Sequence, residues 1–189
     1  MSKPQISKDQ MKDRWRNMVL MFVCWVGVCY SYFLLVFFIK YLPADIYVVS
    51  IVSGLSTFGY LLQNPIANRY DFKMTQLFSF GVVSFLLIIT SLFGSSLNMY
   101  LYATLILIFK LFVCLSFGTV YVVHLDLFDS SFLGTSYGIC NVVSRLAIVT
   151  APMVAEIEDR SIPMLILLAM NCLASVATWF LKKRQTSDN

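Results

Sequence analysis

Long apolar stretches occupy most of the sequence and limit what the chain can fold into. Six of them, each of about 20 residues or more, are separated by short segments in which polar residues return. A bilayer crossing needs roughly 20 apolar residues, and only helices and closed barrels satisfy their backbone inside lipid. A barrel would instead show stretches of about ten residues with alternating polarity. The sequence therefore predicts an all-α, polytopic membrane protein with six transmembrane helices.

Composition agrees with a membrane protein. The 189 residues are 59% hydrophobic and 13% charged, whereas soluble domains carry about 25% charged residues. We expect a polar N-terminal tail over 1–17, a transmembrane domain over 18–181 and a basic C-terminal tail over 182–189. Within the domain, helices are predicted over 18–39, 47–67, 75–95, 99–124, 132–155 and 162–181. The first helix is expected to be a retained anchor, because no short apolar core with a cleavage site precedes it.

Lysine and arginine residues gather on one side of the predicted helices. The N-terminal tail has five, the turn at 68–73 has two and the tail after residue 181 has three, whereas the opposite loops have only Lys40 and Arg160. Basic loops face the cytoplasm. Both termini are therefore expected there, or in the matrix if the membrane is the mitochondrial inner membrane.

Two basic residues, Lys110 and Arg145, fall near the middle of predicted helices. Each lies about 12 residues, or roughly 18 Å, from a helix end, which is too far for a lysine side chain to reach water. Each costs at least about 2.5–3.5 kcal/mol on insertion scales, and the central parts of the six helices contain no acid. The two residues are candidate contacts for an anion, a partner or a lipid head group. In the alternative interpretation, they are structural and are solvated by hydroxyls such as Ser116, Ser144 and Thr150.

Other polar positions give weaker signals. Gly134 and Gly138 have the spacing that lets two helices approach closely, and Asn171 is expected to join helices by hydrogen bonds. His124, the single histidine, is interpreted as part of a solvated helix end. The five cysteines are odd in number and lie inside predicted helices, so they are interpreted as small buried hydrophobic residues. With no nucleophile, phosphate-loop or metal-ligand motif, neither an enzyme nor a cofactor or metal site is predicted.

The later helices resemble the C-terminal six-helix half of the major facilitator superfamily, in its organic cation and anion transporter branch. Residues 121–130, YVVHLDLFDS, stand where that family has YVYTAELYPT, and the helix start at 134–138 and Ala151-Pro152 follow as in the family. Ser144-Arg145 falls where its anion-type members carry a basic residue. Residues 68–73, NRYDFK, fall on its DRxGRR turn. The resemblance runs from about residue 16 to 181 and implies a half-transporter fold.

Departures from the family pattern affect its gating residues. Asn68 replaces the first Asp of the turn and Asp71 its Gly, while Arg69 and Lys73 keep basic residues. The family's Glu-x-x-Pro-Thr-x-x-Arg element has become Asp126, Asp129, Ser130 and Leu133, without its Pro and Arg. These positions are interpreted as degenerate gating motifs.

Two functions follow from the resemblance. In the first, the chain, expected to be complete from Met1, is a non-transporting accessory subunit of a larger membrane assembly, with a respiratory-chain complex as one example of a host. It would contact other membrane subunits in a hetero-oligomer and lipids, including anionic ones, and no nucleic acid. In the alternative, the chain is a half-size transporter that forms a homodimer or pairs with another half chain to move organic anions.

Overall fold

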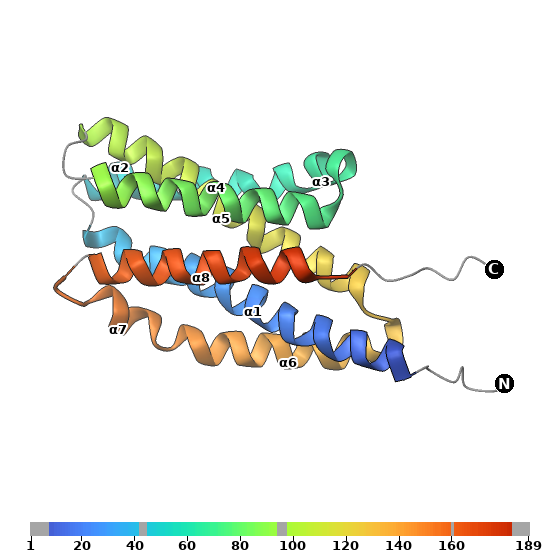
Figure 1. Ribbon diagram of the computed structural model, residues 1–189. Helices are drawn as coiled ribbons and strands as arrows, with labels where there is room; N and C mark the ends of the chain where they lie inside the picture. The colour runs from blue at the N-terminus through green and yellow to red at the C-terminus, as the bar shows by residue number, and fades with distance from the viewer. Residues whose placement is uncertain (1–7, 42–44, 94–97, 160, 183–189) are drawn as a thin grey trace.

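The computed structural model describes residues 8–41, 45–93, 98–159 and 161–182, and every element in these ranges is a helix (Figure 1). The remaining residues, which include most of the predicted C-terminal tail, lie outside the described part. The elements in chain order are α1 (Lys8–Phe38), η1 (Ile39–Tyr41), α2 (Ile46–Leu55), η2 (Ser56–Phe58), α3 (Gly59–Tyr70), α4 (Phe72–Phe93), α5 (Met99–Leu127), α6 (Ser130–Ile148), α7 (Ala151–Ala155) and α8 (Ser161–Phe180).

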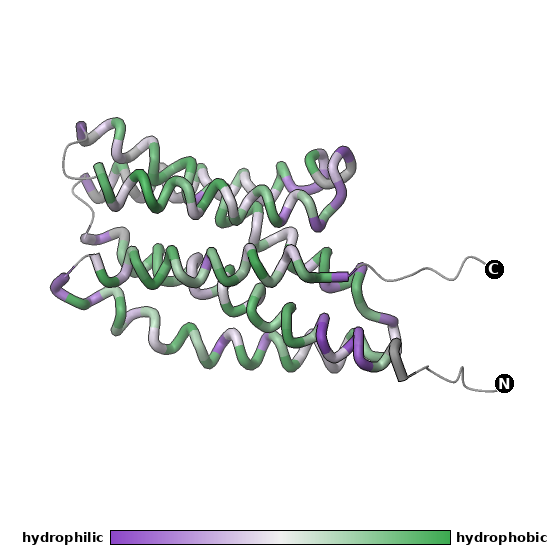
Figure 2. The backbone as a smooth tube through the Cα atoms, viewed as in Figure 1, coloured by the Kyte–Doolittle hydropathy of each residue, from purple (hydrophilic) through white to green (hydrophobic). Residues whose placement is uncertain are grey.

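Five helical stretches in the described ranges are long and apolar enough to cross a bilayer. They are Met11–Phe38, Phe72–Phe93, Tyr100–Leu127, Ser130–Ala155 and Ser161–Phe180. Figure 2 shows apolar residues along the middle of the bundle and hydrophilic residues gathered toward its ends. The all-helical class and the several apolar helices of a multi-pass membrane protein thus agree with the sequence analysis.

The segment expected as the second crossing, 47–67, is helical throughout but changes geometry at Ser56–Phe58. The structure divides it into α2, the short 3-10 helix η2 and α3, and neither α-helix alone is long enough to span. The Ser56 hydroxyl donates to the carbonyl of Ser53 at 2.6 Å, and the Thr57 hydroxyl donates to that of Gly54. Such side-chain bonds to the preceding turn compete with the helical ladder and bend helices, which accounts for the break.

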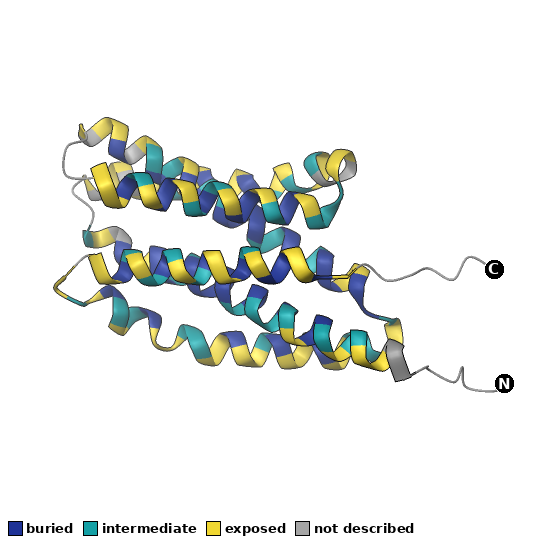
Figure 3. Cartoon of the chain, in the orientation of Figure 1, coloured by how far each residue is buried: buried dark blue, intermediate teal, exposed yellow. Residues whose placement is uncertain are grey.

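Helices α1 and α5 form the centre of the bundle. Helix α1 packs on α8, α6, α5 and α7, while α4 packs on both α5 and α8. Helices α1 and α8 approach closely at Gly27, where an added Cβ would lie 2.9 Å from the Cβ of Ala174. In contrast, α6 keeps exposed residues along most of its length (Figure 3).

Buried polar side chains link the central helices. Asn171 of α8 donates to the Ser31 hydroxyl of α1 at 2.7 Å, as its expected role in joining helices requires. Gln76 of α4 donates to Thr178 of α8 at 3.3 Å, and Ser116 of α5 donates to Ser79 of α4 at 2.7 Å. Interhelical bonds of this kind contribute on average about 0.6 kcal/mol each in membranes.

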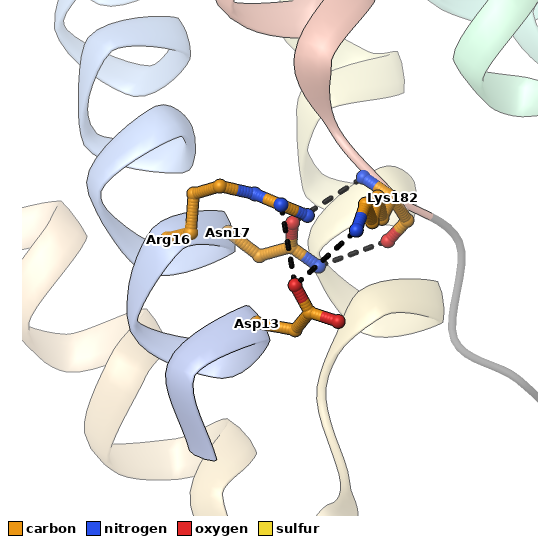
Figure 4. A network of polar contacts seen from close by, with 4 residues as sticks. All are labelled: Asp13, Arg16, Asn17 and Lys182. Carbon is orange, nitrogen blue, oxygen red and sulfur yellow. Dashed lines mark hydrogen bonds and ion pairs between the residues drawn. The ribbon is translucent and has the colours of Figure 1, made fainter. Parts of the chain in front are cut away.

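The start of α1 and the end of α8 meet at one end of the bundle (Figure 4). The Asn17 amide donates to the carbonyl of Lys182 at 2.9 Å and accepts from its backbone N–H at 3.3 Å. Asp13 lies 3.2 Å from the Arg16 guanidinium and 3.5 Å from the Lys182 ammonium. Residues 8–17, placed in the predicted polar tail, thus form the first turns of α1. At the other end, Lys40 pairs with Glu156 at 3.4 Å.

Candidate functional site

Lys110 lies inside the bundle, on α5, with 4% of its surface exposed. Its ammonium donates to the hydroxyl of Ser53, in the last turn of α2, and lies 5.9 Å from the centre of the Tyr32 ring on α1. No carboxylate pairs with Lys110 among the described residues. A hydroxyl and a ring face therefore contact this cation in place of a carboxylate. The hydroxyls expected to solvate the two cations bond elsewhere, Ser116 to Ser79, and Ser144 and Thr150 to carbonyls of their own turn.

Arg145 lies on α6 and is exposed. Its Nε donates to the Asn141 side chain one turn earlier, at 3.4 Å, and its guanidinium lies 5.8 Å from the centre of the Phe33 ring. Beside it lies a shallow, open surface formed by residues of α6 and the residue that follows it: Gly138, Asn141, Val142, Arg145, Leu146 and Val149. In the described part of the chain, no acid neutralises this cation either.

The two cations lie over adjacent rings of α1. The Tyr32 and Phe33 ring centres are 5.3 Å apart, and Tyr32 also lies 5.3 Å from Phe117 of α5. From Phe117 the ring contacts continue to Tyr121, at 5.4 Å, and to Tyr60 of α3, at 6.2 Å. All five rings are half-buried.

We call the surface formed by these side chains the cation–aromatic face: Tyr32, Phe33, Tyr60, Lys110, Phe117, Tyr121 and Arg145. Aromatic rings stack on planar aromatic molecules and attract cations, while arginine and lysine bind carboxylates and other anionic groups. The arrangement can thus hold an aromatic anion, with its charge at a cation and its ring on the aromatic side chains.

Sequence reasoning found the two cations but missed the rings and Ser53. Tyr32 and Phe33 adjoin in sequence, yet nothing in an apolar run rich in aromatic residues marks which rings meet a cation. The surroundings of Ser53 could have been noticed in the sequence, because residues 53–59, SGLSTFG, concentrate hydroxyls and glycines inside an apolar stretch.

The residues at the turn between α3 and α4 have structural roles. Asp71 has a φ of 75°, its carboxylate accepts the N–H of Phe72 at 3.0 Å, and its carbonyl accepts from both Thr75 donors. The Lys73 ammonium donates to the carbonyls of Trp179 and Leu181, at the end of α8. Cations stabilise a helix at this end. Arg69 is exposed beside Tyr70, and the Asn68 side chain lies outside the description.

The two acids at the end of α5 differ in their surroundings. Asp126 is exposed, whereas the carboxylate of Asp129 pairs with the guanidinium of Arg14. The carbonyl of Asp129 also accepts from Leu133 at 2.8 Å, which begins α6. Asp129 thus holds the α5–α6 turn against the start of α1.

Gly134 and Gly138 meet no neighbouring helix within the described chain, because a Cβ at either position would have no atom within 4 Å. Their predicted packing role would need a partner outside this chain. The close helix approaches occur instead at other glycines. A Cβ at Gly59 would overlap the Leu111 carbonyl, and one at Gly118 would overlap the Gln63 side chain.

His124 is fully buried, which corrects its interpretation as part of a solvated helix end. Its Nε2 lies 2.9 Å from the Ser136 hydroxyl of α6, and rings of Trp25, Phe128 and Tyr137 surround it at 4.7–5.8 Å. The burial follows because Trp25 of α1 and Ser136 and Tyr137 of α6 cover this last turn of α5. Neither its Nδ1 nor the indole N–H of Trp25 has a hydrogen-bond partner among the described residues.

All five cysteines are free thiols. Four are buried, as expected of small hydrophobic residues: Cys24, Cys29, Cys114 and Cys140. Cys172 is exposed on α8, contrary to that expectation.

No protein-family model and no curated protein matches this sequence. The geometry of the cation–aromatic face therefore carries the functional argument.

Proposed function

We propose that the chain is a six-helix half of a transporter of the major facilitator type and that its cation–aromatic face binds an organic anion. Of the two functions that the sequence predicts, this alternative gains most from the geometry. The observation that carries it is the position of Lys110 and Arg145 over the adjacent rings of Tyr32 and Phe33. The open Arg145 would take the charge of an aromatic anion, and the neighbouring rings its apolar part.

The energetics of this face depend on two cations, Lys110 and Arg145, that lack a counter-charge among the described residues. Each cation inside a bilayer costs at least about 2.5–3.5 kcal/mol, and neither meets a carboxylate among the described residues. An anion on this face offsets that cost and adds charge-assisted hydrogen bonds, worth about 1.5–3 kcal/mol each. A second helical body, another copy or another chain, would cover the face and close the pathway, as in transporters that place substrate between two halves.

Binding of benzoate, a small aromatic anion, tests this function. The full chain is placed in lipid nanodiscs, and benzoate affinity is compared between wild type, Arg145→Gln and Arg145→Lys. Loss of one charge-assisted bond should weaken binding by roughly 10- to 100-fold in Arg145→Gln, while Arg145→Lys should keep part of the affinity. Arg69→Gln is the matched control, because Arg69 is exposed at a turn away from the rings. Equal benzoate affinity in wild type and Arg145→Gln would overturn the proposal.

The second candidate is the accessory subunit, favoured by the exposed surface of α6. Apolar side chains of this helix are uncovered, Val142 at 60% and Leu146 at 66%, as are both glycines. A hetero-oligomer would cover this surface permanently with another membrane subunit. Native mass spectrometry after mild-detergent extraction separates the two functions. A hetero-oligomer of constant stoichiometry that does not bind benzoate supports the accessory-subunit function. A homodimer, or a pair with another six-helix chain, that binds benzoate supports the transporter function.

We further propose that both termini face the cytoplasm or, in a mitochondrion, the matrix. The described ends of the chain lie at the same end of the bundle, together with the α3–α4 and α5–α6 turns (Figure 1). That end holds Arg14, Arg16, Lys73 and Lys182, and basic residues mark the inner side of a membrane. In sealed vesicles whose lumen corresponds to the cytoplasm or matrix, a membrane-impermeant amine reagent added outside should label Lys40 and spare Lys182.

A further inference from the structure

Within the segment α2–η2–α3, the helices before and after Ser56–Phe58 pack on different numbers of neighbouring helices. Helix α2 exposes 77% of Tyr47 and 65% of Ile51, and its main packing partner outside its own segment is α5. Beyond the break, α3 packs on both α5 and α4. The backbone at Gly59 lies so close to the Leu111 carbonyl that a side chain would not fit. Among the described residues, 56–58 thus join a helix that packs mainly on α5 to one that packs on both α5 and α4.

The break has the composition of a hinge. The hydroxyls of Ser56 and Thr57 bond to carbonyls of the preceding turn, and Gly54, which has open space around its Cα, precedes them. A short 3-10 stretch inside a helix often marks a functional hinge. Glycines allow the backbone dihedral changes that a hinge absorbs.

A hydrogen bond between described residues joins α2 to the cation–aromatic face, beside the packing of α2 on α5. It runs from the Lys110 ammonium on α5 to the Ser53 hydroxyl, three residues before the break. Lys110 is 4% exposed in this arrangement, whereas Arg145 is open. An anion arriving at the face can reach Arg145 directly but cannot reach Lys110 while Ser53 and Tyr32 cover its ammonium.

We propose that α2 is a movable gate over Lys110, with Ser56–Phe58 as its hinge and the Lys110–Ser53 hydrogen bond as its latch. This inference rests on the proposed anion site. An anion binds first at Arg145 and then contacts Lys110 only when α2 has swung away. Because that contact exists in the open arrangement alone, the bound anion shifts the population of α2 toward it. The gate thereby couples occupancy of the site to the position of one helix.

Hydrogen–deuterium exchange of the full chain in nanodiscs tests the gate, with the backbone amides of residues 46–58 as the readout. Ser53→Ala removes the latch and should speed their exchange by about threefold without ligand, the factor expected from one interhelical hydrogen bond. Ser50→Ala is the matched control, since Ser50 is an exposed residue of α2 one turn earlier. Saturating benzoate should also speed exchange in wild type, and by less in Ser53→Ala.

The outcomes separate the gate from the anion site, since benzoate binding is measured independently. If benzoate binds but leaves the exchange of 46–58 unchanged, and Ser53→Ala behaves as Ser50→Ala does, the gate is wrong and the anion site stands. If benzoate does not bind, the anion site and the anion-driven opening are both wrong. Faster exchange in Ser53→Ala would then still support the latch, and unchanged exchange would overturn it.

Discussion

The guanidinium of Arg14 pairs with the carboxylate of Asp129 and joins the first turns of α1 to the residue that precedes α6. From its sequence, Asp129 was expected to belong to a degenerate gating motif. In the structure its ion pair joins two helices of the same bundle. The lysine of the other motif, Lys73, has a comparable role at the end of α8.

A double-mutant cycle with Arg14→Gln and Asp129→Asn measures the strength of this ion pair. The two side chains are 29% and 25% exposed, so water and salt screen the pair, and we expect a coupling free energy of about 0.2–1 kcal/mol. The coupling should shrink as salt is raised. Reversible unfolding in detergent gives the four stabilities.

Asp126→Asn serves as the control for that cycle, because Asp126 is exposed and forms no ion pair among the described residues. It should show no coupling to Arg14→Gln. Coupling of equal size at both acids would mean that a general field, and not the observed pair, is being measured.

Alanine substitutions should distinguish glycines that pack inside the bundle from those that do not. In Gly27→Ala the new methyl would lie 2.9 Å from the Ala174 Cβ and 3.1 Å from the Met170 carbonyl oxygen. We expect a loss of about 1–3 kcal/mol, typical of overpacking. Gly134→Ala and Gly138→Ala meet open space, so they should keep or raise stability by up to about 1 kcal/mol.

The same pair of glycines tests whether α6 faces a partner. Gly138→Leu should leave the bundle folded but lower the fraction of assembled protein in native mass spectrometry, because a bulky side chain blocks close helix approach. An unchanged assembly with Gly138→Leu would place the partner on another surface.

The tautomer of His124 follows from its hydrogen bonds. The Ser136 hydroxyl has one proton and lies 3.0 Å from the Leu133 carbonyl; when it donates there, it accepts from His124 Nε2 at 2.9 Å. The ring is then expected to carry its proton on Nε2. Because the chain has a single histidine, ¹⁵N-histidine NMR in nanodiscs gives one pair of ring signals to check.

Substitution of the hydroxyl tests that assignment. Ser136→Ala removes the acceptor and should change the Nε2 signal, whereas Ser131→Ala, at an exposed position on α6, should leave it unchanged. A proton found on Nδ1 in wild type would contradict the assignment.

The sequence predicted the helical class and most of the long helices, because a continuous apolar run in lipid can satisfy its backbone hydrogen bonds within itself only as a helix. It did not predict the break at Ser56–Phe58, since hydropathy averages over the run and ignores hydroxyls that bond back to the chain. It placed Lys110 and Arg145 at similar depths but could not tell that both lie over α1 rings. Which faces of two helices meet depends on tertiary packing. The burial of His124 was missed for the same reason, as Ser136 lies twelve residues away across a turn.

The charge selectivity of the cation–aromatic face tests its proposed role most directly. Equilibrium dialysis of the full chain in nanodiscs compares three ligands of similar shape: benzoate, neutral benzyl alcohol and cationic benzylammonium. With Lys110 and Arg145 as binding groups, benzoate should bind at least about tenfold more tightly than benzyl alcohol, a difference of about 1.4 kcal/mol, and benzylammonium most weakly. Benzylammonium binding as tightly as benzoate would contradict an anion site on this face.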